Sequence, residues 1–167
     1  YTGEDTLSLH DALPILKAYL PEYDTPLKKS KRVAVVGGGM VGGALALGLA
    51  RQGFSVTVIE QQAPPAFDVT AQPDVRISAI STSSVALLRE LGVWDAVLAM
   101  RCHPWERLET WEWENAHVIF DAQELKLPQL GYMVENNVLQ RALWDAMERH
   151  PQVTLRVPSA LSTMRLN

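Results

Sequence analysis

Cysteine is almost absent from this sequence, long apolar runs are missing, and basic residues are not in excess. Cys102 is the only cysteine, which excludes an internal disulfide and a cysteine-built zinc site and fits a reducing compartment. The longest apolar run, Met40–Ala50, has eleven residues including its glycines, whereas a membrane-spanning helix needs about 20. The formal net charge is -4, and a basic cluster occurs only at Lys28–Arg32. Composition therefore argues against a membrane-spanning protein and against a nucleic-acid-binding protein.

The first thirty residues do not resemble part of a folded domain. The first methionine is Met40, and the segment TLSLHDALPI at residues 6–15 resembles translated sequencing-adapter DNA. The residues that follow carry Pro21, Pro26 and the basic cluster without a sustained apolar period. We therefore expect residues 1–31 to be a non-native leader or a disordered linker and exclude them from the fold prediction. Residues 32–167 suffice for one modest hydrophobic core.

The strongest pattern begins directly after this segment. Val33–Val36 is a β-branched apolar run, typical of a strand buried on both faces, and Gly37, Gly39 and Gly42 then satisfy the spacing G-x-G-x-x-G. A helical stretch follows from Met40 to Gln52. In such a unit the first glycine permits a tight turn, the second lets the main chain approach a pyrophosphate, and the third lets the helix pack close to the strand. The pattern predicts a dinucleotide site at a helix N-terminus.

A second predicted strand, Ser55–Ile59, ends at Glu60, about twenty residues after the glycines. An acidic residue at that position accepts hydrogen bonds from ribose hydroxyls and disfavours a ribose that carries a phosphate. This argues against NADP at the site but does not distinguish NAD from FAD.

The residues after Glu60 favour FAD. A plain NAD domain continues at once into another helix and strand, whereas here residues 61–75 predict a proline-containing loop. We then expect a helix over 81–91, an antiparallel hairpin of 107–114 and 117–120 turning at Asn115 and Ala116, a helix over 137–149 and a third parallel strand over 153–157. The predicted fold class is α/β: a Rossmann-like FAD-binding domain with a parallel sheet core and an inserted helix and hairpin.

Four segments together resemble the ubiquinone-biosynthesis flavin monooxygenases: VAVVGGGMVGGALALGLARQGFSVTVIE, QPDVRISAISTSSVALLRELGVWDAV, AMRCHPWERLETWEWENAHVIFDAQELKLP and GYMVENNVLQRALWDAM. The resemblance covers residues 32–157 and is most specific around Arg76 and from Cys102 to Trp113. It implies that FAD is reduced by NAD(P)H and that one oxygen atom of O2 is transferred to the ring of a prenylated benzoquinol. The partners it implies are that quinol and a ubiquinone-biosynthesis complex. The location it implies is the cytoplasm, peripheral to the inner membrane.

The resemblance also assigns a cofactor-binding set. It comprises the glycine turn, the acid after the second strand, a loop running along the cofactor, and the start of the last helix: Gly37, Gly38, Gly39, Met40, Val41, Gly42, Glu60, Arg76, Ile77, Ser78, Asn136 and Gln140. The family's Gly-Asp and Asp-Gly segments and its substrate-covering sheet have no counterpart here. We therefore expect residues 32–167 to be the N-terminal part of the FAD-binding domain without a substrate domain, assign no catalytic residue, and expect no turnover by this chain alone.

Several alternatives remain open. Arg76 taken by itself is typical of a surface arginine paired with Asp74, and Glu135 is typical of a helix-start residue rather than a general base. The four histidines show no ligand spacing, so no metal site is predicted. The competing functions are a sister hydroxylase of the same pathway, a phenol hydroxylase, and a nucleotide-binding module without redox chemistry.

Overall fold

The computed structural model describes residues 31–113 and 116–164 of the 167-residue chain, and from Arg32 onward the chain forms one compact unit. The expected leader, residues 1–31, lies outside the described residues except for Lys31. The Asn115 position of the predicted turn also lies outside them.

A parallel three-stranded sheet forms the first layer. It consists of β1 (Arg32–Val36), β2 (Ser55–Ile59) and β8 (Val153–Arg156), in the order β1-β2-β8. All three strands were predicted, although β8 ends one residue before the expected Val157. β2 is central, and its burial alternates along the strand, with Val56 and Val58 buried on the face that packs into the core.

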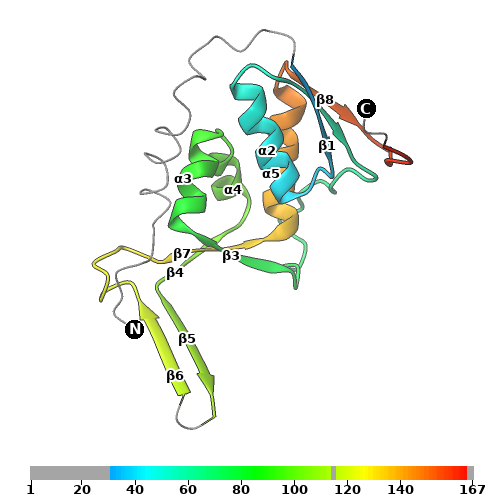
Figure 1. Ribbon diagram of the computed structural model, residues 1–167. Helices are drawn as coiled ribbons and strands as arrows, with labels where there is room; N and C mark the ends of the chain where they lie inside the picture. Colours follow the sequence, from blue (N-terminus) through cyan, green and yellow to red (C-terminus); the bar gives the residue numbers. More distant parts are fainter. Residues whose placement is uncertain (1–30, 114–115, 165–167) are drawn as a thin grey trace, which may run out of the picture. The chain divides into compact units, whose positions relative to one another are not determined.

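Two helices pack against this sheet and against each other, as Figure 1 shows. They are α2 (Met40–Arg51) and α5 (Asn136–Arg149), and both match predicted helices to within one residue at each end. The helices approach closely because Gly43 has no side chain: a Cβ there would lie 3.2 Å from Cβ of Leu143. Leu47, Leu143, Trp144 and Met147 are almost fully buried and form the core of the unit with the sheet valines.

The segment between β2 and β8 contains more helices and strands than predicted. It holds β3 (Ile77–Ser81), α3 (Thr82–Glu90), α4 (Trp94–Met100), β4 (His103–Trp105) and β7 (Gly131–Glu135), and the three strands form an antiparallel sheet in the order β3-β7-β4. Only α3 was predicted. These strands are three to five residues long and include serines, a proline and a glycine, so they show no sustained apolar alternation. Ile77 and Ser78, expected in a loop, belong to β3.

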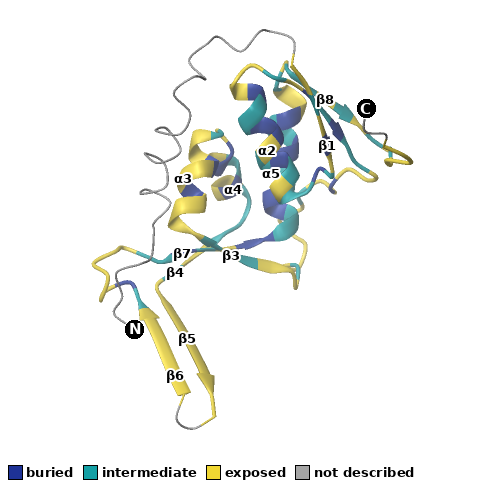
Figure 2. Ribbon diagram, viewed as in Figure 1, coloured by how far each residue is buried: buried dark blue, intermediate teal, exposed yellow. Residues whose placement is uncertain are grey.

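The predicted hairpin is present as β5 (Arg107–Glu112) and β6 (Ala116–Asp121). Ala116, expected in the turn, instead begins β6 and pairs with Glu112, the last residue of β5. Three residues therefore separate the strands where two were predicted. Figure 2 shows both strands exposed, and within the described residues they pair only with each other.

Candidate cofactor-binding site

The three parallel strands end at one edge, and the predicted site residues gather there. Gly37 follows β1 and donates its N–H to Ile59 O at 2.9 Å, while Glu60 follows β2 and donates to Arg156 O at 3.0 Å. Ser159 closes the edge by donating to Glu60 O at 2.8 Å. A hollow opens at this edge, lined by Val36, Gly37, Ile59, Glu60, Gln61, Ser159, Ala160 and Leu161. Ligands of open α/β sheets bind at such carboxyl edges.

The glycines of the turn differ in what surrounds them. Gly37 has φ +99°, a backbone conformation that side-chain-bearing residues rarely adopt. A Cβ on Gly42 would overlap the carbonyl oxygen of Gly37 and would lie 3.4 Å from Val35 Cγ1. A Cβ on Gly39 would have no neighbour within 4 Å. Gly42 therefore serves the close packing of helix on strand, whereas the main chain at Gly39 faces open space.

The N-terminus of α2 is free to receive an anion. Its N-cap is Gly39, no side chain caps it, and no acidic residue lies in its first turn. The first N–H groups of a helix and its partial positive charge attract phosphate when nothing in the protein satisfies them. The residues present therefore fit a pyrophosphate at this turn.

The Glu60 carboxylate also holds the glycine turn, a role that sequence reasoning missed. Its Oε2 accepts from Gly38 N at 2.6 Å, and its Oε1 accepts from Gln61 N at 2.7 Å and Gln62 N at 3.2 Å. The hydrogen bond from Gly38, aided by those from Gln62 and Gln61, lowers the pKa of Glu60 against the opposing effect of burial. Since a carboxylate offers about four acceptor positions, the second position of Oε2 is left for a ribose hydroxyl.

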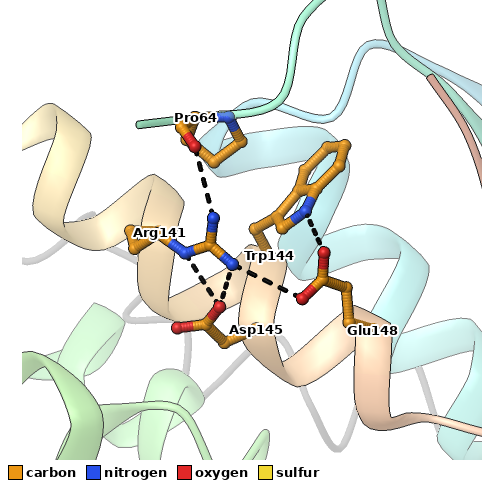
Figure 3. Close-up of polar contacts among 5 residues, drawn as sticks. All are labelled: Pro64, Arg141, Trp144, Asp145 and Glu148. Atoms are coloured by element: carbon orange, nitrogen blue, oxygen red, sulfur yellow. Dashed lines mark hydrogen bonds and ion pairs between the residues drawn. The ribbon is translucent and has the colours of Figure 1, made fainter. Parts of the chain in front are cut away.

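The Trp144 side chain packs against the same turn at Gly38. A Cβ on Gly38 would lie 2.9 Å from Cζ3 of this buried indole, so the middle position of the motif must also be glycine. The indole is oriented by its N–H, which donates to Glu148 Oε1 at 2.8 Å (Figure 3). Sequence reasoning missed Trp144, although its spacing from Gln140 was a usable signal.

Arg141 links this helix to the loop after Glu60 (Figure 3). Its guanidinium donates to Asp145 Oδ1 with Nε at 2.8 Å, to Glu148 Oε2 at 3.4 Å and to Pro64 O at 3.2 Å. The hydrogen bond to Asp145 raises the pKa of Arg141, so the guanidinium stays charged. Because Arg141 and Trp144 share Glu148, the loop anchor and the support of the glycine turn belong to one network.

The second group of predicted residues meets at the start of α5. Asn136 N donates to Arg76 O at 2.9 Å, and Ser78 Oγ donates to Asn136 Oδ1 at 2.6 Å. The main chain of Arg76 donates to Asp74 Oδ1, but the two side chains form no ion pair among the described residues. The Arg76 guanidinium is exposed rather than tied to its neighbour.

Helix α5 connects the two groups. Asn136, Gln140 and Trp144 follow one another at four-residue spacing and so lie on one face of the helix. The first contacts the Arg76 segment and the last contacts Gly38. Ile77 and Val41 are largely exposed. Val41 lines an open hollow at the glycine turn together with Gly37, Gly39, Met40 and Gly42.

The described residues also bear on metal binding and on membrane crossing. Within residues 31–113 and 116–164, no three His, Cys, Asp or Glu side chains are grouped as a metal ion would require. No helix in this part of the chain is long and apolar enough to cross a membrane.

Comparison with known proteins agrees with this geometry. Residues 30–165 match the family model described as FAD binding domain. The chain is 74% identical over 129 residues to 3-demethoxyubiquinol 3-hydroxylase of Escherichia coli, covering 77% of this chain and 33% of that protein. It is 36% identical over 133 residues to the ubiquinone hydroxylase UbiL of Rhodospirillum rubrum, covering 80% of this chain and 30% of that one. The chain thus spans about a third of the length of these relatives.

Solved structures share the fold. The tetrameric form of 2-methyl-3-hydroxypyridine-5-carboxylic acid oxygenase superposes with a TM-score of 0.58 at 23% identity, covering 78% of this chain and 32% of that one. The protein FqzB superposes with a TM-score of 0.61 at 16% identity, covering 82% and 30%. At these identities the likeness concerns the fold alone.

Proposed function

Because this chain belongs to the FAD binding domain family, we propose that it is the cofactor-binding part of an NAD(P)H- and O2-dependent monooxygenase that hydroxylates the ring of a prenylated benzoquinol in ubiquinone biosynthesis. The E. coli relative named 3-demethoxyubiquinol 3-hydroxylase supports the substrate class. The observation that carries the cofactor assignment is the glycine turn, open at Gly39 and held at Gly38 by the Glu60 carboxylate.

We assign the two ends of the cofactor to the two groups of residues. The N–H groups of the turn from Gly37 to Gly42 bind the pyrophosphate, and Glu60 Oε2 accepts from the adenosine ribose. Arg76 and Ser78 contact the cofactor along its length, and Asn136 and Gln140, at the start of α5, reach its phosphates and ribose. FAD, when bound, supplies the redox chemistry, while these residues bind and orient it.

The contribution of the protein to the reaction follows from these contacts. A charged guanidinium at Arg76 balances phosphate charge, and its exposure leaves it able to do so. Three main-chain N–H groups donate to the carboxylate of Glu60 and lower its pKa, so they favour the ionised form that accepts from a ribose hydroxyl. We propose a cytoplasmic location peripheral to the inner membrane, because the proposed substrate, a prenylated quinol, resides in the bilayer.

The first test is flavin binding by the purified chain. A yellow product whose flavin fluorescence is quenched on binding supports the proposal. A colourless product that leaves added FAD fluorescence unchanged contradicts it and favours a nucleotide-binding module without redox chemistry.

The second test concerns the substrate. This gene is deleted from the source strain, and the quinones of the deletion strain are separated and identified by mass spectrometry. Accumulation of demethoxyubiquinone supports hydroxylation at the ring position that the name of the E. coli relative gives. Accumulation of an earlier intermediate indicates a sister hydroxylase, and an unchanged quinone profile indicates a phenol hydroxylase or another role.

A further inference from the structure

A long loop joins two residues of the proposed site. Residues 61–76 form neither helix nor strand, yet Glu60 precedes the loop and Arg76 ends it. Connections of more than about 12–15 residues without regular structure are uncommon in compact domains and are usually functional. The position of Arg76 therefore depends on what fixes the end of this loop.

Two arginines fix the loop by its carbonyl oxygens. Arg141 donates to Pro64 O at 3.2 Å near the start of the loop. Arg101, which follows α4, donates to Ala71 O at 3.1 Å and lies 5.4 Å from the centre of the Phe67 ring. A guanidinium suits this task because it presents several donors in a fixed plane and can also stack on an aromatic ring.

Glu135 fixes the end of the loop. Its Oε2 accepts from Asp74 N at 2.8 Å, and Arg101 Nε lies 3.0 Å from its Oε1. The N–H of Arg101 does not point at Oε1, so that oxygen has an ion-pair partner but accepts no hydrogen bond. At 6% exposure, Glu135 is the one charged residue in the buried set of the described chain. A buried carboxylate is costly unless it is paired, so this pair is not a neutral feature of the packing.

The main chain at Glu135 meets the segment that carries Arg76. Glu135 pairs with Ile77 in the β3–β7 register, and the next residue, Asn136, donates to Arg76 O. Side chain and main chain of adjacent residues thus hold Asp74 and Arg76 on either side of Val75. Fixing these two points sets the position of the Arg76 main chain, from which its side chain extends.

We propose that Glu135, which is buried, and Arg101, whose side chain is 29% exposed, form a clasp that positions Arg76 for the cofactor, a role distinct from catalysis. The proposal rests on the proposed function for the contact of Arg76 with FAD, but the clasp itself is a property of the loop. Arg101 holds the middle of the loop, Glu135 holds its end, and the ion pair joins the two.

A double-mutant cycle on FAD affinity tests the positioning role. Glu135→Gln keeps an acceptor for Asp74 N but removes the charge that faces Arg101, and Arg76→Gln removes the positioned group. We expect each single change to raise the FAD dissociation constant about tenfold, roughly 1.4 kcal/mol. We expect the double variant to bind no more weakly than Arg76→Gln alone, because the clasp acts through Arg76. Glu90→Gln, an exposed acid at the end of α3, is the matched control and should bind FAD normally.

A second readout does not depend on FAD. Cleavage by chymotrypsin after Phe67, which is half-buried against Arg101, reports opening of the loop. We expect faster cleavage in Glu135→Gln and in Arg101→Lys, which keeps the charge but loses the planar fork. If cleavage is unchanged in both variants, the clasp is refuted even where FAD binds. If cleavage rises but the losses in affinity multiply in the double variant, the positioning of Arg76 is refuted. If the unaltered chain binds no FAD, the proposed function fails while cleavage still decides on the clasp.

Discussion

Three alanine substitutions in one segment separate packing from cofactor binding. Gly39, Gly42 and Gly48 each gain only a methyl group, but the structure places those methyl groups in different surroundings. At Gly42 the Cβ overlaps the Gly37 carbonyl oxygen, which belongs to the main chain and cannot rotate away. At Gly39 and Gly48 no atom lies within 4 Å of the Cβ.

The magnitudes follow from these surroundings. Within a helix, glycine to alanine gains about 1 kcal/mol, so Gly48→Ala should stabilise the chain by roughly 0.5–1 kcal/mol. Gly42→Ala gains the same term, but forcing atoms into filled space costs about 1–3 kcal/mol or more, so a net loss of about 1–2 kcal/mol is expected. At the N-cap, Gly39→Ala loses some capping preference and reduces the entropy of the unfolded chain, and these effects of up to about 1 kcal/mol nearly cancel.

Thermal unfolding followed by circular dichroism, together with flavin fluorescence titration, checks the series. For a unit of this size, 1 kcal/mol shifts Tm by roughly 2–4 °C, so Gly42→Ala should lower Tm, Gly48→Ala should raise it and Gly39→Ala should leave it nearly unchanged. Gly39→Ala should lose FAD affinity by about tenfold or more while its stability stays nearly unchanged, and it should be the only one of the three variants to combine these two results. If Gly39→Ala binds FAD as tightly as the unaltered chain, or if Gly42→Ala and Gly48→Ala unfold alike, the reasoning from the glycine geometry is refuted.

Three further predictions concern the same turn. Because folding lowers the pKa of Glu60, its carboxylate contributes stability above the ordinary glutamate pKa, and this contribution is lost as pH falls through the lowered value. The difference in unfolding free energy between the unaltered chain and Glu60→Gln should therefore shrink on acidification. Denaturant titration at several pH values measures this difference. Trp144→Phe should cost about 1–3 kcal/mol by leaving space where the larger indole is buried, yet it should make Gly38→Ala less damaging, with a coupling of about 0.5–3 kcal/mol in a double-mutant cycle. Gly37→Ala should lose roughly 1–2 kcal/mol through backbone strain at φ +99°, with no contribution from crowding, so Gly37→Asn should recover part of the loss in the same unfolding assay.

Sequence patterns predicted the parallel layer because its strands are rich in β-branched apolar residues and its helices are long and periodic. The glycine motif also marks the step from β1 to α2. The antiparallel sheet was missed although β3 and β7 are as long as β1, because its strands mix apolar residues with serines, a proline and a glycine and are stabilised by pairing between distant segments, such as Ile77 with Glu135. No local pattern reports a pairing of that separation.

The site was predictable in its chemistry but not in its connections. The motif located the turn and Glu60, and the family resemblance selected Arg76 and the start of α5. Neither indicated that Glu60 binds Gly38 or that Trp144 fills the space beneath it. The Trp144 contact depends on how closely α5 approaches α2, where Gly43 leaves room for Leu143, and Gly43 is not one of the motif glycines.

These connections imply that the turn is organised by the protein itself. Gly37 N is held by Ile59 O, Gly38 N by the Glu60 carboxylate, and Gly43 N by Gly39 O at 2.8 Å. Order that folding has already imposed need not be imposed by the cofactor, so binding energy is not spent on closing the turn. Glu60→Gln can keep an acceptor while losing the charge that strengthens the Gly38 bond, so it separates turn geometry from charge. If its FAD affinity falls while Gly39→Ala still shows a further loss of the same size, the two residues act on different parts of the cofactor, as assigned.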